Sequence, residues 1–169
     1  MLILVILTQP EERPDKLVDI SFNTTESAEL YFRNVRAYHY LQRQEGGDIF
    51  DVYRLKSLFD SGYQPMMPFV IYNNWRANEA FVRLDTVHHR LTSFHAVIDS
   101  AGLSARAIAL PDLYNEAQFD YARAIYRALR DECEVGMAAE GHDTLWLRGD
   151  ERKATKRVLT DYFRLIGKL

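Results

Sequence analysis

Histidines and an aspartate recur in the middle of the sequence at a spacing that would place them along one side of a helix. His88, His95 and Asp99 are separated by seven and four residues, which correspond to two turns and one turn of an α-helix. An imidazole that is oriented by a carboxylate one turn away can act as a general acid or base, or can bind a transition metal. One hypothesis is therefore a hydrolase that uses acid–base or metal-assisted chemistry. Because the two histidines would lie about 10 Å apart along the helix axis, we predict no bound metal and no cofactor.

A second group of residues with binding chemistry lies on two predicted amphipathic helices. Guanidinium groups bind phosphate in a bidentate manner, and an aromatic ring among them gives a nucleic-acid base a surface for stacking. On each helix the basic side chains share the side opposite to the apolar residues. The residues expected to contact an anion are Arg33, Arg36, Tyr40, Arg43, Lys153, Lys156, Arg157 and Arg164.

Charge is unevenly distributed along a chain that is nearly neutral as a whole, with a formal net charge of −3. Residues 148–169 carry seven basic and three acidic residues, whereas residues 112–143 carry three basic and eight acidic residues. Segregation of this kind steers an anionic partner toward the basic part of a surface. The leading function hypothesis is therefore a small intracellular binding protein for nucleic acid or a phosphorylated ligand.

The tyrosines favour a further hypothesis, which is a non-enzymatic regulator that acts through a protein–protein interface. The chain has 10 tyrosines, and tyrosine and arginine are both enriched at protein interfaces. Tyr31 and Tyr38 lie on the apolar side of the first predicted helix, where packing against a core or a partner, including a second copy, is expected. The sequence contains no G-x-G-x-x-G, P-loop, G-x-S-x-G, H-E-x-x-H or C-x-x-C motif, and we recognise no family resemblance. Whether the protein is an enzyme is left open.

These candidate residues must be positioned by strands that alternate with helices. Residues 1–7, MLILVIL, are apolar throughout, which predicts a strand buried on both faces. Further strands are predicted at 17–22, 69–72, 105–110 and 144–147. Helices are predicted at 23–46, 48–61, 75–101, 112–133 and from 149 to the C-terminus, with a glycine-bearing loop at 136–141.

Alternation of strands with helices is typical of α/β proteins. We predict a single α/β domain over residues 1–169, with a mixed or mostly parallel sheet of about five strands flanked by about five helices. A hydrophobic fraction of 47% is enough for a packed core, and one cysteine fits a reducing compartment. The apolar start is too short to span a bilayer and lacks the features of a signal peptide. We expect a cytoplasmic protein without membrane contacts.

Overall fold

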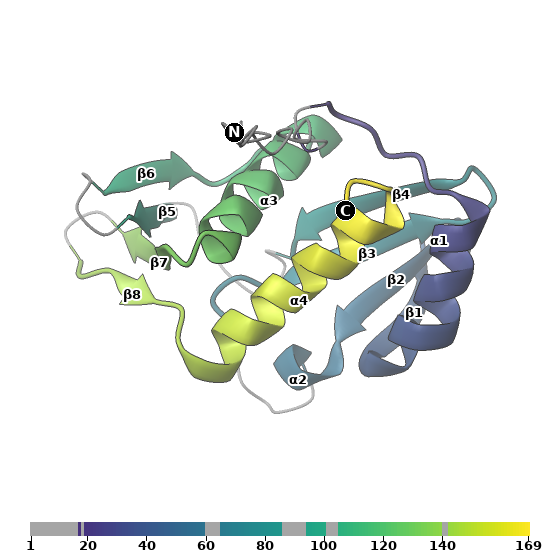
Figure 1. Ribbon diagram of the computed structural model, residues 1–169, viewed down its shortest axis with the longest axis horizontal. Helices are drawn as coiled ribbons and strands as arrows, with labels where there is room; N and C mark the ends of the chain where they lie inside the picture. Colours follow the sequence, from purple (N-terminus) through teal and green to yellow (C-terminus); the bar gives the residue numbers. More distant parts are fainter. Residues whose placement is uncertain (1–16, 18, 60–64, 86–93, 101–104, 140–141) are drawn as a thin grey trace, which may run out of the picture.

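The computed structural model (Figure 1) contains two antiparallel sheets instead of the single, mostly parallel sheet that the sequence predicted. It describes residues 17, 19–59, 65–85, 94–100, 105–139 and 142–169. Each sheet has four strands, in the orders β1-β2-β3-β4 and β6-β5-β7-β8. The prediction of about five strands and five helices around one parallel sheet is therefore wrong. The predicted strand at residues 1–7 lies outside the described residues.

The first sheet is a meander in which neighbouring strands follow one another along the chain. Its strands are β1 (Tyr40–Glu45), β2 (Phe50–Leu55), β3 (Phe69–Asn74) and β4 (Glu79–Leu84). The predicted strand at 69–72 is confirmed as β3. Gly46, Gly47 and Asp48 all have positive φ, which is the backbone twist that a tight turn between β1 and β2 requires. The predicted helix at 48–61 is replaced by β2, followed by the short helix α2 (Lys56–Phe59).

The long helix predicted at 75–101 is not formed, because two strands from different sheets occupy its ends. β4 alternates strictly, with Ala80, Val82 and Leu84 buried between half-buried neighbours. The turn before it is made by asparagines instead of glycine or proline. Asn78 has a φ of 54°, and the Asn74 side chain accepts a hydrogen bond from the Ala77 amide. Asparagine tolerates the left-handed conformation and forms such turns readily.

The second sheet draws its strands from the second half of the chain. They are β5 (Phe94–Asp99), β6 (Arg106–Ala109), β7 (Glu134–Ala139) and β8 (Leu145–Trp146). The strands predicted at 105–110 and 144–147 are confirmed, whereas the predicted loop at 136–141 begins inside β7. Gly136 lies in β7 because a Cβ there would stand 2.6 Å from the Leu145 carbonyl oxygen. The glycine thus marks a close approach of two strands instead of a loop.

The helical segments at the two ends of the described chain lie beside each other. The first consists of α1 (Glu26–Tyr31), a π-helical turn (Phe32–Arg36) and a 3₁₀ turn (Ala37–His39). The helix predicted at 23–46 therefore ends at His39, and Tyr40 begins β1. The predicted helices at 112–133 and from 149 are confirmed as α3 (Asn115–Arg130) and α4 (Gly149–Leu165). No strand is present at residues 19–22, although Asn23 forms an isolated bridge with Glu79.

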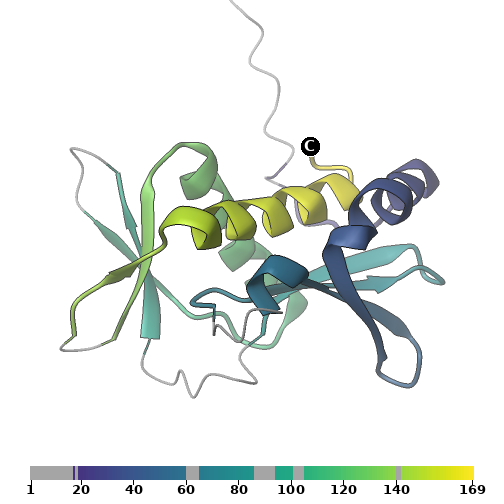
Figure 2. The ribbon, with the colours of Figure 1, turned by 90° about the horizontal axis from the view of Figure 1, so that it is seen from below.

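Helix α4 runs across one face of the first sheet and packs beside α3 (Figure 2). Its inward side chains are fully buried, and the rings of Tyr162 and Phe163 contact Phe119 of α3 at centroid distances of 6.5 and 5.7 Å. A further side of α4, the one that carries Asp161, faces the helical segment 26–39. Within the described residues, no helix is long and apolar enough to cross a membrane.

Candidate anion-binding seam beside helix α4

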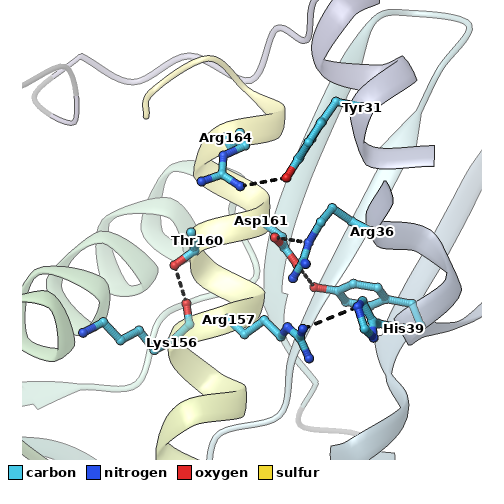
Figure 3. Close-up of polar contacts among 9 residues, drawn as sticks. Tyr31, Arg36, His39, Lys156, Arg157, Thr160, Asp161 and Arg164 are labelled. Carbon is cyan, nitrogen blue, oxygen red and sulfur yellow. Dashed lines mark hydrogen bonds and ion pairs between the residues drawn. The ribbon is translucent and has the colours of Figure 1, made fainter. Parts of the chain in front are cut away.

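Two of the predicted anion-binding helical faces adjoin in space. The segment 26–39 lies against α4, and the line along which they meet is here called the seam (Figure 3). The seam consists of Tyr31, Tyr38 and His39 on the first segment and Arg157 and Arg164 on α4, next to the half-buried Arg36 and the buried Asp161. Arg157, Asp161 and Arg164 are four and three residues apart, so they follow one side of α4.

Arg36, one of the predicted anion contacts, is already occupied by a carboxylate within the protein. Its Nε and Nη2 atoms donate to the two Asp161 oxygens at 2.8 and 2.9 Å, and the Tyr40 hydroxyl donates to Asp161 Oδ2 at 2.8 Å. Asp161 is 3% exposed and Tyr40 is also 3% exposed. The hydrogen bond to Asp161 raises the pKa of Arg36, and burial, followed by the Asp161 charge, raises that of Tyr40. Arg36 and Tyr40 therefore join the two segments and do not present free groups to a ligand.

Cationic groups converge on the exposed end of the seam. Arg157 Nη2 lies 3.4 Å from His39 Nε2, and the Lys56 ammonium donates to the Tyr38 carbonyl at 2.9 Å. Desolvation, and then the charges of Arg157, Arg36 and Lys56, lower the pKa of His39. The Asp161 charge acts in the opposite direction, and the net effect favours the neutral imidazole. This is the electrostatic environment that an added anion would relieve.

Two tyrosines that were expected in the core lie at the surface of the seam. Tyr38 is 65% exposed and its ring stacks on His39 with centroids 3.8 Å apart. Tyr31 is 39% exposed, its hydroxyl accepts from Arg164 Nη1 at 3.3 Å, and the Arg164 guanidinium lies 5.5 Å from the ring centroid. The apolar face predicted for this helix is thus turned outward, and each exposed ring adjoins a cation or an imidazole.

The remaining predicted contacts are scattered. Arg33 pairs with Glu29 and lies 5.7 Å from the Trp75 ring centroid, and Arg43 is exposed on β1. Lys153 pairs with Asp150, and Lys156 pairs with Glu132 on the flank of α4 that faces α3. The structure therefore brings Arg157 and Arg164 together with Arg36, and separates the other four basic residues from them.

The predicted segregation of charge is partly cancelled inside the molecule. The acidic residues that follow α3 lie beside the basic first half of α4. Glu132 pairs with Lys156 and Arg152, and Glu134 pairs with Arg148. The hydrogen bond from Lys156 lowers the pKa of Glu132. Positive charge consequently remains on the second half of α4, at the seam.

The proposed stripe of His88, His95 and Asp99 does not exist as a helix face. His88 lies outside the described residues, and His95 and Asp99 are both on β5. Four residues of strand separate them by about 13 Å, compared with about 6 Å on a helix, so Asp99 does not orient His95. Among the described residues, no group of three histidine, cysteine or acidic side chains could hold a metal ion.

As parts of an anion-binding site, sequence reasoning missed Tyr31, Tyr38 and His39 of the seam, the adjoining Asp161, and Lys56, which contacts the Tyr38 carbonyl. The spacing did contain a signal for Asp161, because an acidic residue four positions after Arg157 and three before Arg164 interrupts a basic helix face. Nothing in the sequence indicated that His39 meets α4, because it is 118 positions from Arg157 in the chain.

Comparisons with known proteins add no relative. No family model matches the chain, and neither a curated protein nor a solved structure matches it. The chemistry of the seam therefore rests on its own residues.

Proposed function

We propose that the seam binds the phosphate backbone of a single-stranded nucleic acid. The observation that carries this proposal is that Arg157 and Arg164, both exposed on one side of α4, each adjoin aromatic side chains of the facing segment (Figure 3). Arg164 contacts the Tyr31 ring, and Arg157 contacts His39, on which the exposed Tyr38 ring stacks. Guanidinium groups supply bidentate phosphate contacts, and tyrosine rings supply stacking surfaces for bases.

The spacing of the arginines suits a polynucleotide. Arg157 and Arg164 are seven residues apart on α4, which is about 10 Å along the helix axis. Stacked nucleotides rise by about 3.4 Å each, so the two guanidinium groups span about three nucleotides. A single strand leaves its bases unpaired, and only unpaired bases can stack on Tyr38 and Tyr31.

The local charge supports an anionic partner. The pair of Arg36 and Asp161 is internally neutral, whereas Lys56, Arg157 and Arg164 add positive charge on the exposed side. The carbonyl, imidazole and hydroxyl groups that these cations contact carry no negative charge. Among the residues that the structure describes, none of these three cations forms an ion pair with a carboxylate, so a phosphate would add a full counter-charge.

Fluorescence anisotropy of labelled oligodeoxythymidylate, titrated at low and at physiological salt, tests the proposal. We expect Arg157→Gln to weaken binding about tenfold, because a charge-assisted hydrogen bond contributes about 1.5–3 kcal/mol. It should also reduce the slope of log K against log salt by about 0.7, the value for one single-strand phosphate contact. Tyr38→Ala should weaken single-strand binding by about 1–3 kcal/mol and leave duplex binding unchanged.

Lys153→Gln is the matched control, because Lys153 lies on the same helix, is 82% exposed and pairs only with Asp150 among the described residues. Binding that responds equally to Lys153→Gln and Arg157→Gln would contradict a site at the seam. Absence of binding at low salt, where phosphate contacts are strongest, would overturn the proposal. Competition by a mononucleotide as strong as by the oligonucleotide would assign the seam to a small phosphorylated ligand instead.

A protein partner is the second candidate, and a separate observation favours it. Trp75 is 44% exposed, and the guanidinium groups of Arg33 and Arg76 lie 5.7 and 5.3 Å from its ring centroid. The exposed Leu30 lines the same hollow. Tryptophan and arginine dominate the binding energy of protein interfaces. Sedimentation of the chain alone checks the simplest case, a homodimer. Trp75→Ala should abolish such a dimer and leave oligonucleotide binding unchanged.

A further inference from the structure

The face of the first sheet that is turned away from the seam carries three adjoining aromatic rings. Tyr53 of β2 contacts Phe32 of the helical segment, with ring centroids 5.0 Å apart. Because side chains alternate along a strand, Phe50 of β2 lies on the opposite face. There it contacts the rings of Tyr72 on β3 and Phe81 on β4 edge-on, at centroid distances of 6.0 and 6.2 Å. All three rings are half-buried, so they form an apolar surface that a ligand can reach.

A hollow of about 400 Å³, here called the sheet hollow, lies over these rings and has charged ends. Arg83 and Glu79 line it from the same face of β4 as Phe81, which stands between them. Four residues of strand separate their backbones by about 13 Å. Glu45 also lines the hollow, but its carboxylate accepts from Arg54 at 2.9 Å. The sheet hollow is therefore positive at Arg83, apolar in the middle and negative at Glu79.

The Arg83 guanidinium is oriented by its neighbours but is not neutralised by them. Its Nη2 atom donates to Asn115 Oδ1 at 3.0 Å, and its Cζ atom lies 5.3 Å from the Tyr72 ring centroid. Its Nε atom is shielded from solvent and has no hydrogen-bond partner in the part of the chain that the structure describes. Within the same part, neither Arg83 nor Glu79 forms an ion pair. Both charges are thus available to a ligand.

We infer that the sheet hollow binds a short apolar peptide with free termini. The terminal carboxylate would take paired N–H groups of Arg83, an apolar side chain would cover the rings, and the terminal ammonium would meet Glu79. Three extended residues span about 10 Å. This length suits the site, because the Arg83 guanidinium leans over Tyr72, which pairs with Phe81 and so lies nearer to Glu79. A single amino acid carries both charges on one carbon and would leave one end of the hollow unpaired.

Isothermal titration calorimetry of the full chain with the tripeptide alanyl-phenylalanyl-alanine tests the inference. Binding should be saturable, and amidation of the carboxyl terminus should weaken it about tenfold or more, because it removes the charge that meets Arg83. Arg83→Met should weaken binding of the unmodified tripeptide to the same extent and should bind the two peptides equally. Arg43→Met is the matched control, because Arg43 is exposed on the same face of the sheet but lies outside the sheet hollow. Urea unfolding checks that each variant is folded.

The opposite end of the hollow is tested with an acetylated peptide and with phenylalanine. Acetylation of the amino terminus should weaken binding to the unaltered protein and leave binding to Glu79→Gln unchanged. Phenylalanine alone should bind at least tenfold more weakly than the tripeptide. Equal loss on amidation for the unaltered protein and Arg83→Met, equal effects of Arg83→Met and Arg43→Met, equally strong binding of phenylalanine, or no binding at millimolar tripeptide would each overturn the inference. None of these results depends on oligonucleotide binding at the seam.

Discussion

Removal of the Asp161 carboxylate should destabilise the protein more than any other single change at the seam. Asp161 accepts three hydrogen bonds, two from Arg36 and one from Tyr40. In Asp161→Ala the Arg36 guanidinium, whose side chain is only 17% exposed, would lose its counter-charge. Breaking a buried ion pair in this way costs about 3–5 kcal/mol. The buried Tyr40 hydroxyl would also lose its acceptor, which places the expected loss in the upper part of that range.

A double-mutant cycle separates the coupling between Arg36 and Asp161 from the loss of packing. Arg36→Met keeps the apolar stem and leaves Asp161 with the Tyr40 hydroxyl, so it should also cost about 3 kcal/mol. The double variant should be less destabilised than the sum of the single variants by at least about 2 kcal/mol, because neither buried charge remains. Urea unfolding gives each free energy of unfolding. If Asp161→Ala costs less than about 1 kcal/mol, or if the effects are additive, the buried pair does not hold the two segments together.

Three further predictions concern the core, a strand crossing and pH. Tyr162→Phe should raise the free energy of unfolding by about 1 kcal/mol, since its hydroxyl is fully buried without a hydrogen-bond partner among the described residues; a loss in thermal unfolding would show that the hydroxyl is satisfied. Gly136→Ala should cost about 1–3 kcal/mol in urea unfolding, because the new Cβ would meet the Leu145 carbonyl at 2.6 Å, whereas Gly47→Ala has no such contact and strains only the turn. The free energy of unfolding should fall as the pH drops below about 6.5, because the pKa of His39 is lowered in the folded protein and the unfolded state therefore binds the proton first. His39→Asn should make the urea midpoint less sensitive to acid, and an unchanged acid dependence would contradict this assignment.

Elements were predicted correctly where the apolar residues fit the period of a helix or that of a strand, but not both. The helices α3 and α4 were predicted correctly, because a wide apolar arc repeated over four turns has no interpretation as a strand. Ala80 and Leu84, like Phe94 and Ile98, are four residues apart. This spacing satisfies both a helix, with a period of 3.6, and a strand, with a period of 2. The stretch 75–101 is therefore ambiguous. It contains no glycine or proline to mark a turn, because the turn is made by Asn74 and Asn78.

The parallel sheet was inferred from an apparent alternation of strands and helices. That alternation disappears because strands occupy parts of the helices predicted at 23–46, 48–61 and 75–101. Once 40–45 and 50–55 are strands, two of the three connections in the first sheet, 46–49 and 75–78, are only four residues long. Connections of that length join antiparallel strands, since a parallel crossover needs about a dozen residues. The same error affected the prediction of the anion-binding residues. Because the helical segment ends at His39, Tyr40 and Arg43 lie on β1 and not on the predicted helix face. Arg157 and Arg164 do share one side of α4, which was predicted correctly.

The π-helical turn at Phe32–Arg36 has a consequence for the length of the chain. In this turn the Ala37 amide donates to the Phe32 carbonyl, five residues back, so the turn holds one residue more than an α-helical turn. Deletion of the exposed Asn34 would close it to an ordinary helix without breaking the run of hydrogen bonds. Because the five residues of a π turn cover about the rotation and rise of four residues of an α turn, the later residues of the segment would keep their direction relative to α1. Arg36 and His39 would still face α4, although each would be one position nearer to Glu29 in the chain. In chains related to this one, the arginine that faces Asp161 is thus identified by its place after this turn and not by a fixed number of residues from Glu29.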